Sequence, residues 1–228
     1  MPSAPLIILG NGRTSCVART VDSIRAHLSG FGPVTVVDDS GDENHRAWLR
    51  ETVAPILDAS VVPVASGRAG YPAAMQRVWA LARAHESVAF WEEDFVLTED
   101  VDLSELAAVL TDRPYLTQMA LIRQPWFGNE IAHGGMIEAL EAQGQHFTEV
   151  SDAHGHDWIE HRAVFTGNPS LIPARTLAHD WPSGDWSESR FGRALFGSDP
   201  RLRGAYWGRR SDLPRVEHIG HQRVGAGY

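Results

Sequence analysis

The sequence predicts an α/β fold with a central, mostly parallel sheet flanked by helices. Between residues 6 and 100, short apolar runs of strand length alternate with segments whose apolar residues follow the helical period. No repeat, low-complexity tract or linker interrupts the 228 residues. Alternating β and α segments form parallel strands joined by right-handed crossovers, so we expect one continuous domain over residues 1–228.

Strand–helix units fill the first hundred residues or so of the chain. Each predicted strand ends in a turn rich in glycine or in acidic residues, where backbone or carboxylate groups can reach a ligand. The predicted strands are residues 6–9, 34–37, 60–64 and 88–91, and the predicted helices are residues 17–28, 43–57 and 73–85.

The last of these strands breaks directly into Glu92, Glu93 and Asp94. Three adjacent carboxylates at the end of a buried strand repel one another in a partly desolvated place. A divalent cation removes that cost, and carboxylate oxygens suit Mg²⁺ or Mn²⁺. The alternative interpretation is a solvated acidic turn.

The second half of the chain is less regular. We expect helices at residues 103–110, 137–143 and 188–195 and a strand at residues 116–122. The segment 124–135 is rich in Gly, Trp and Phe and is expected to be a substrate-facing loop. Residues 1–100 would then form a ligand-binding half, and residues 101–228 the half that receives a second substrate.

Charge and cysteine usage limit the classes of function. The net charge of −9 argues against a generally basic nucleic-acid-binding surface, although all 20 basic residues are arginine and the window 190–223 has a local balance of +5. Cys16 is the only cysteine, which suits a reducing cytoplasm. The N-terminal apolar run is too short for a signal peptide or a membrane span, so we expect a cytoplasmic protein without membrane contact.

The order of these turns resembles glycosyltransferase family 2, whose members have the Rossmann-like GT-A fold. The resemblance covers residues 6 to 100 and rests on four motifs. They are Gly10-Asn11-Gly12-Arg13, Val37-Asp38-Asp39-Ser40, the glycine-rich segment 67–70 and Glu92-Glu93-Asp94. It implies transfer of a sugar from a nucleotide-sugar donor, with a UDP-sugar expected, and a donor site made of Gly10, Asn11, Arg13, Asp38, Asp39, Arg68 and Glu93.

The same resemblance implies a metal site for Mn²⁺ or Mg²⁺. Its ligands would be Asp94, Glu92 and a late histidine, for which we choose His218 over His221. Glu92 stands where the family has aspartate, so its longer side chain would ligate through water. A surface histidine in an arginine-rich segment is the alternative interpretation of His218.

Direct displacement with inversion needs a base that takes the proton of the acceptor hydroxyl. The family places a carboxylate at the start of a helix in the second half, and Glu188 is the preferred candidate, with Asp185 behind it. The same two residues also have the spacing of a helix capping box, which is the structural alternative.

The acceptor is not determined by the sequence. Candidate contacts are Trp126, Trp158 and Trp186, which could stack on a sugar or a base, and Arg209 and Arg210, which could bind phosphate. A hydroxymethylated base in DNA, a protein and a small glycoside are the acceptor classes considered, because small stand-alone enzymes of this type include phage-type transferases acting in the host cytoplasm.

Alternative functions are a nucleotidyltransferase of the same layout and a non-catalytic module that binds nucleotide or sugar. The histidines of the loop 154–161 offer a further, less regular candidate for a metal cluster. The oligomeric state is not predicted.

Overall fold

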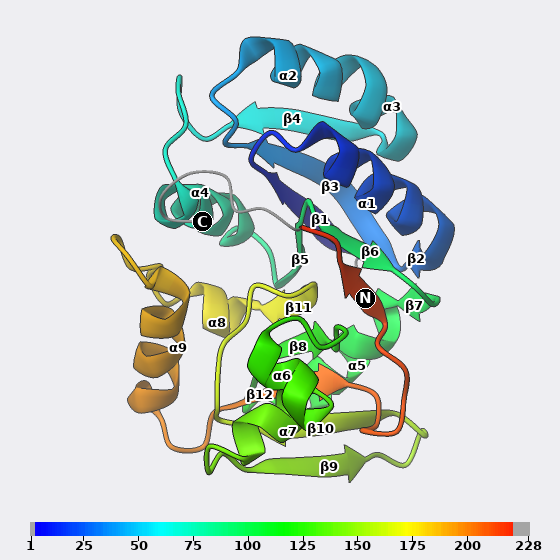
Figure 1. Ribbon diagram of the computed structural model, residues 1–228, viewed down its shortest axis with the longest axis vertical. Helices are drawn as coiled ribbons and strands as arrows, with labels where there is room; N and C mark the ends of the chain where they lie inside the picture. Colours follow the sequence, from blue (N-terminus) through cyan, green and yellow to red (C-terminus); the bar gives the residue numbers. More distant parts are fainter. Residues whose placement is uncertain (1–2, 221–228) are drawn as a thin grey trace.

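The computed structural model describes residues 3–220, in which a nine-stranded sheet runs through the whole molecule (Figure 1). The strand order is β4-β3-β1-β5-β11-β8-β12-β10-β9. The four strands of the first half are mutually parallel and are β1 (Ala4–Gly10), β3 (Phe31–Asp38), β4 (Ala59–Pro63) and β5 (Ser87–Glu92). The predicted fold class is therefore confirmed.

The second half extends this sheet with mixed directions. Strand β11 (Ser170–Pro173) pairs antiparallel with both β5 and β8 (Leu116–Leu121), whereas β12 (Arg203–Trp207) pairs parallel with β8. Antiparallel β10 (Asp157–His161) and β9 (Phe147–Ser151) complete the far edge.

Helices cover both faces of the sheet, as the two-residue alternation along β1 requires. Leu6 and Ile8 pack on the side of α1 (Thr14–His27) and α5 (Leu103–Asp112). Ile7 and Leu9 pack on the opposite side, which carries α4 (Tyr71–Ala82), α8 (Ala174–Leu177) and α9 (Ser187–Ser198). The first strand is thus buried on both faces, which explains its continuous apolar run.

The helix predicted at residues 43–57 is interrupted. It consists of α2 (Glu43–Trp48), a π-helical turn η1 (Leu49–Val53) and α3 (Ala54–Leu57). Pro55 in the first turn of α3 has no backbone N–H to donate, and the N–H of Ala54 reaches back five residues to the carbonyl of Leu49. Proline therefore explains why one predicted helix became three short segments.

The segment expected to be an open loop at residues 124–135 contains the helix α6 (Gly128–His133), followed by α7 (Met136–Glu141). Glu130 orders its start, because its carboxylate accepts hydrogen bonds from the backbone N–H groups of Trp126 and Phe127. Arg123 also binds Glu130 through two hydrogen bonds of 2.6 and 2.8 Å.

Two small ribbons complete the fold. β2 (Leu28–Ser29) pairs with β7 (Val101–Asp102), and β6 (Phe95–Leu97) pairs antiparallel with β13 (Val216–His218). The second ribbon brings residues far apart in the sequence to the acidic turn after β5. Within residues 3–220, no helix has the length and apolar character needed to cross a bilayer.

Candidate active site

The candidate site lies at the carboxyl ends of the parallel strands β1, β3 and β5. These ends are in register, because Gly10 at the end of β1 pairs with Asp38 of β3, and Leu9 pairs with Glu92 of β5. The backbone N–H of Asp39 also donates to the carbonyl of Gly10 at 2.8 Å. The sheet therefore gathers the predicted turns at one edge, where open α/β sheets bind ligands.

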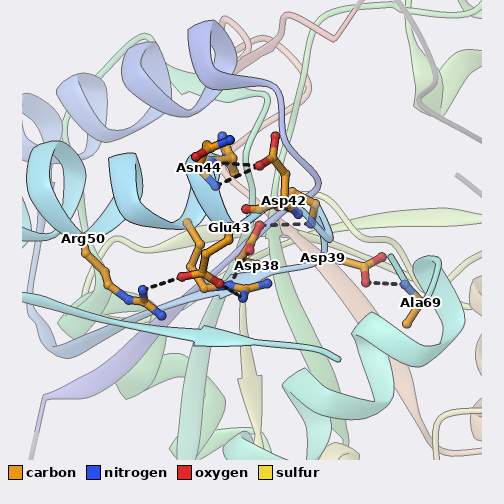
Figure 2. A network of polar contacts seen from close by, with 10 residues as sticks. Asp38, Asp39, Asp42, Glu43, Asn44, Arg50 and Ala69 are labelled. Carbon is orange, nitrogen blue, oxygen red and sulfur yellow. Dashed lines mark hydrogen bonds and ion pairs between the residues drawn. The ribbon is translucent and has the colours of Figure 1, made fainter. Parts of the chain in front are cut away.

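Asp39 fixes the loop that precedes α4. Its fully buried carboxylate accepts hydrogen bonds from the backbone N–H of Ala69 at 2.7 Å and from that of Gly70 at 2.9 Å. Figure 2 shows Asp39 directed toward Ala69, on the side of the strand end away from Glu43 and Arg50. Asp39 thus orders the glycine-rich segment that the sequence analysis placed in the donor site.

Asp38 is directed to a different partner. Its buried carboxylate pairs with the guanidinium of Arg46 in α2 at 2.9 Å and accepts the N–H of Ser40 at 3.0 Å. Asp42 caps the same helix through a hydrogen bond of 2.8 Å from Asn44 (Figure 2). These contacts commit the Asp38 side chain to anchoring α2.

Arg68 and Asn11 connect two of the turns. The exposed Arg68 donates to the carbonyl of Asn11 at 2.6 Å, which draws the segment before α4 over the turn after β1. The side-chain oxygen of Asn11 is buried without a hydrogen-bond partner. A buried acceptor without a partner is uncommon and marks a place where a ligand donor would be favourable.

Glu93 fixes the turn after β1 through hydrogen bonds to two of its residues. Its buried carboxylate accepts the N–H of Asn11 at 2.9 Å and the Nε–H of Arg13 at 2.6 Å. Burial raises the pKa of Glu93, and the charge and hydrogen bond of Arg13 offset part of that rise. Glu93 therefore positions Asn11 and Arg13, and its contacts are within the protein.

Asp94 meets the late histidine predicted from the sequence. Its Oδ2 lies 2.8 Å from Nη1 of Arg13 and 3.0 Å from Nε2 of His218, and its carbonyl accepts the N–H of Ile219 at 2.8 Å. The His218 ring stacks on Phe95 with centroids 4.7 Å apart. Burial would raise the pKa of Asp94, but the hydrogen bond from His218 and the charge of Arg13 outweigh it and lower that pKa.

The Asp94–His218 pair has the donor atoms that a divalent cation needs. Oδ1 of Asp94 and Nδ1 of His218 are both buried without a hydrogen-bond partner. Among residues 3–220, no three His, Cys, Asp or Glu side chains gather into a complete metal cage. Because Nε2 of His218 faces Oδ2 of Asp94, a cation between the two side chains would replace their hydrogen bond and take its remaining ligands from phosphate and water, as Mg²⁺ and its relatives do.

The chain passes directly over this pair at Gly220. A Cβ atom added at Gly220 would collide with Oδ2 of Asp94 and would lie 2.5 Å from Nη1 of Arg13. Only glycine allows the backbone to approach this closely. The alternative ligand His221 lies outside the described residues.

The histidines of the loop after β9 form no second metal cluster within the described part of the chain. Nδ1 of His156 instead lies 2.9 Å from Oδ2 of Asp152, whose carboxylate also accepts the backbone N–H groups of His154 and His156. These hydrogen bonds hold the pKa of Asp152 down at about 2 despite some desolvation. The contacts explain the loop as a local turn.

Glu92 lies in a second group of side chains, with Tyr71 and Glu188. The Tyr71 hydroxyl is 3.1 Å from Oε1 of Glu92 and 3.3 Å from Oε2 of Glu188. A Cβ atom at Gly167 would lie 2.5 Å from Oε1 of Glu92, so the backbone closes over the group. The hydrogen bond of Glu92 is thus with Tyr71, whereas Asp94 and His218 contact each other.

The three groups of this cluster are difficult to ionise. Burial, followed by the charges of Asp94 and Glu188, raises the pKa of Glu92 well above its ordinary value. Burial also raises the pKa of Glu188, although hydrogen bonds from the Gly167 N–H and from Tyr71 offset part of that rise. Perturbed carboxylates at a strand-end site are typical of groups that handle protons.

Glu188 lies in the first turn of α9, and Asp185 does not join it in the site. Asp185 is exposed, and the residue at the helix cap is Trp186, in the left-handed conformation with φ of 57°. No side chain caps this helix end. The capping-box alternative for Asp185 and Glu188 is therefore not observed.

The candidate tryptophans divide into three environments. Trp126 packs edge-on against His218, with ring centroids 4.1 Å apart. Trp186 is 77% exposed. Trp158 is fully buried in the core and donates its indole N–H to Glu160, so its ring is not accessible to an acceptor as predicted. Strand β10 is covered on both faces, since Ile159 on the opposite side is also fully buried.

The predicted phosphate contacts already have acidic partners. Nε of Arg209 lies 2.8 Å from Oδ2 of Asp157, and Arg210 makes two hydrogen bonds to Glu141. Both arginines follow β12 near the β9 edge of the sheet, and the Arg210 N–H binds Glu149. The positive balance of this sequence window is therefore largely compensated by acids from other parts of the chain.

Tyr71 and a pocket beside Glu188 are parts of the site that the sequence did not predict. The pocket has a volume of about 820 Å³ and lies between α6, α7, the segment 162–166 and α9. Tyr71 is the first residue of α4, next to Pro72, which is a helix-start signal. That signal predicts the helix, but only the tertiary fold shows that the side chain reaches Glu188.

The chain has a GT-A fold, which the solved glycosyltransferases described next share. Its first-half strands are parallel, acidic turns follow the strand ends, and a late histidine contacts one of these turns. The mannosyltransferase PcManGT from Pyrobaculum calidifontis, solved with GDP-Man and Mn²⁺, matches with a TM-score of 0.64 and 14% identity over 97% of this chain and 58% of its own. GalNAc-T7 with UDP, GalNAc and Mn²⁺ matches with a TM-score of 0.63 and 11% identity over 94% of this chain and 43% of its own.

S. aureus TarS 1–349 in complex with UDP matches with a TM-score of 0.60 and 15% identity over 94% of this chain and 60% of its own. This chain thus spans between 43% and 60% of the three solved chains. No protein-family model matches the sequence, and no curated protein matches it either.

Proposed function

We propose that this protein is a metal-dependent glycosyltransferase that moves a sugar from a nucleotide-sugar donor to a hydroxyl group of an acceptor. One observation carries the proposal: the pair Asp94 and His218, whose side chains could hold a cation, lies at the same strand-end edge as a partly buried base candidate, Glu188. The similar solved structures support the proposal, because their descriptions include GDP-Man, UDP and Mn²⁺.

The donor is proposed to bind over the turns after β1 and β3. The buried side-chain oxygen of Asn11 has no partner and suits a donor group of the nucleotide, and Asp39 holds the adjoining loop in place. We retain a UDP-sugar as the expected donor, and TarS 1–349 was solved with both UDP and UDP-GlcNAc. Cytoplasmic location remains the expectation for a chain whose single cysteine, Cys16, is free.

Asp94 and His218 would hold the Mn²⁺ or Mg²⁺ ion. When bound, such an ion stabilises the negative charge that grows on the departing nucleoside diphosphate. Arg13 lies on Oδ2 of Asp94 and adds a fixed positive charge at the same place. Glu92 is assigned to the carboxylate group around Tyr71, because its hydrogen bond is directed there.

Glu188 is proposed to take the proton of the acceptor hydroxyl in an inverting displacement. It lines the pocket of about 820 Å³, so an acceptor inside that pocket would have direct access to its carboxylate. Tyr71 and the Gly167 N–H orient this carboxylate through hydrogen bonds. Asp185 is exposed and is not assigned a role in the reaction.

Among the acceptor classes, the structure gives the least support to DNA held by Arg209 and Arg210. Both side chains pair with carboxylates, and neither residue lines the pocket that contains Glu188. A hydroxymethylated base would therefore need other phosphate contacts. We place the acceptor in the pocket itself.

The test is a nucleotide-sugar screen with Mn²⁺, in which the released nucleotide is identified by chromatography. With a nucleotide sugar as substrate, the proposed transfer releases a nucleoside diphosphate, whereas a binding module releases nothing. A nucleotidyltransferase would release pyrophosphate only in a parallel assay with a nucleoside triphosphate and a sugar phosphate. Glu188→Gln should lower kcat by about a hundredfold and leave donor affinity within about twofold, since a general base contributes about 10²–10⁴ in rate. Asp185→Asn is the matched control and should behave as the parent protein.

A further inference from the structure

The pocket beside Glu188 is large enough for a small molecule and opens between two pairs of elements. Helices α6 and α7 form one wall, and α9 with the segment 162–166 forms the other. Its volume of about 820 Å³ lies within the usual range of ligand pockets, about 300–1,000 Å³. One residue of the proposed reaction, Glu188, lies on its wall.

The inner wall of this pocket is apolar. It is formed by side chains from α7, the segment 162–166 and α9, namely Met136, Ala139, Leu140, Val164, Phe165 and Phe196. Phe127, which is 51% exposed, stands at the α6 side. Such a surface favours a ligand with a substantial apolar body, because the removal of apolar area from water is favourable and grows with that area.

Two of the charged groups on the wall are already paired with each other. Arg123 binds Glu130 through two hydrogen bonds and donates a third to the carbonyl of Gln124. Arg162 instead donates to backbone carbonyls after α9, including those of Asp199 at 3.1 Å and Leu202 at 2.9 Å. These groups have little hydrogen-bonding capacity left for the many hydroxyls of a sugar.

Arg193 is the exception among the arginines of the wall. It is exposed on α9, five positions after Glu188, and makes no hydrogen bond or ion pair with the described residues. An arginine at the edge of a ligand pocket with no internal partner is available for a carboxylate or phosphate, which it binds through two parallel hydrogen bonds.

We infer that the acceptor is a hydroxylated small molecule with an apolar, ring-sized body and one anionic group. The body fills the space between Leu140, Val164 and Phe196, the anionic group binds Arg193, and the hydroxyl reaches the Glu188 carboxylate. This inference rests on the proposed function for the role of the hydroxyl. The binding site itself does not depend on turnover.

The test measures binding to the full chain by isothermal titration calorimetry, without donor. The probes are 6-hydroxy-2-naphthoate, which has both features, 2-naphthol, which lacks the anionic group, and glucuronate, which lacks the apolar body. We expect the naphthoate to bind about tenfold more tightly than the naphthol, as one hydrogen-bonded charge pair predicts. Glucuronate should bind more weakly than either.

Two substitutions separate the two contacts. Arg193→Ala should remove the tenfold preference for naphthoate and leave naphthol binding unchanged, whereas Val164→Asn, at a partly exposed position, should weaken both naphthyl probes. The matched control is Arg25→Ala, since Arg25 is also an exposed helical arginine but lies on α1 and away from the pocket wall.

Three results would overturn the inference: no binding of either naphthyl probe, equal or tighter binding of glucuronate, or a naphthoate preference that survives Arg193→Ala. The outcome is independent of the nucleotide-sugar screen. Naphthoate binding without any sugar transfer would leave the pocket assignment intact and reject the transferase. Sugar transfer to a polar acceptor, without naphthyl binding, would support the transferase and reject the pocket assignment.

Discussion

The hydroxyl of Tyr71 lies 3.3 Å from Oε2 of Glu188, and the two residues are 117 positions apart in the chain. This contact joins the first residue of α4 to the first turn of α9. The same hydroxyl lies 3.1 Å from Glu92. One hydroxyl carries one proton, so it donates to only one of the two carboxylates at a time, and the other must be satisfied differently.

Tyr71→Phe should lower kcat by about tenfold with little change in the KM for donor, because the hydroxyl orients the base and does not bind the nucleotide. Steady-state kinetics at saturating donor measure the effect. Tyr115→Phe is the matched control, since its hydroxyl binds Glu160 near the other edge of the sheet. Equal losses in the two variants would mean that the fold, and not the position of Glu188, was disturbed.

The same variant should change the dependence of activity on pH. A base must be ionised to work, and burial raises the pKa of Glu188 from its ordinary value of 4.5, so kcat should fall as the pH drops through this raised pKa. The Tyr71 hydrogen bond lowers that pKa, so Tyr71→Phe should move the acidic limb to higher pH. A limb that stays in place would argue against the orienting role.

Asp94→Asn should lower kcat by at least about a hundredfold and abolish the increase in melting temperature that Mn²⁺ produces with UDP, because the metal supplies several kcal/mol of charge stabilisation. Thermal shift and turnover are measured with and without EDTA. Asp100→Asn, which changes an exposed acid that pairs with His27, serves as the control. Full activity of the parent protein in EDTA would reject the metal-dependent mechanism.

Asp39→Ala should raise the KM for donor more than it changes kcat, since the loop before α4 that Asp39 holds is proposed to bind the donor alike in the ground and transition states. It should also loosen the segment before α4, because two backbone N–H groups at Ala69 and Gly70 lose their acceptor. Hydrogen exchange at these amides would detect the second effect. A loss confined to kcat would place Asp39 in the chemical step.

Replacing Arg209 and Arg210 by alanine should leave activity and its salt dependence nearly unchanged, because both side chains pair with acids outside the pocket. Kinetics between 50 and 200 mM salt, roughly the range over which phosphate contacts weaken most visibly, would check this. A DNA acceptor held by these arginines would instead give a steep salt dependence that the double variant flattens by about one unit per lost contact.

The stability of the protein should decrease as the pH falls below about 6.5, in part because of His161. Burial lowers the pKa of this histidine to about 3. Between about pH 6.5 and pH 3 the unfolded chain therefore binds a proton at this residue and the folded protein does not. The contribution of His161 to the free energy of unfolding is fully present above the unfolded-state pKa. It decreases by at most about 1.4 kcal/mol per pH unit as the pH falls to about 3. His161→Phe should flatten the urea-unfolding profile in this interval, whereas the exposed His85→Gln should not.

Local sequence patterns were sufficient for the four parallel strands of the first half. Each of β1, β3, β4 and β5 is bounded by residues that act locally: glycines, prolines and acids at strand ends. The proximity of Asp94 and His218 was also within reach, because the family resemblance implies a late histidine near the acidic turn, and His218 ends the short strand β13.

What the sequence did not predict depends on contacts between distant segments. The hydrogen bond between Glu92 and Tyr71 joins residues 21 positions apart. Arg209 and Arg210 likewise pair with acids on β10 and α7 that charge counting could not locate. The burial of Trp158 depends on the elements that cover both faces of β10, which its flanking residues do not specify.

The antiparallel pairing of β6 with β13 also sets an order of events during synthesis. Phe95 is opposite His218, so β6, which directly follows the acidic turn, has no partner strand until more than one hundred further residues have been synthesised. A ribosome that has reached residue 215 has produced every strand of the nine-stranded sheet, yet the nascent protein still lacks the imidazole that meets Asp94. Removing the chain from residue 216 onward would therefore delete β13 and the proposed metal-binding histidine, while leaving all nine strands of the large sheet in the sequence.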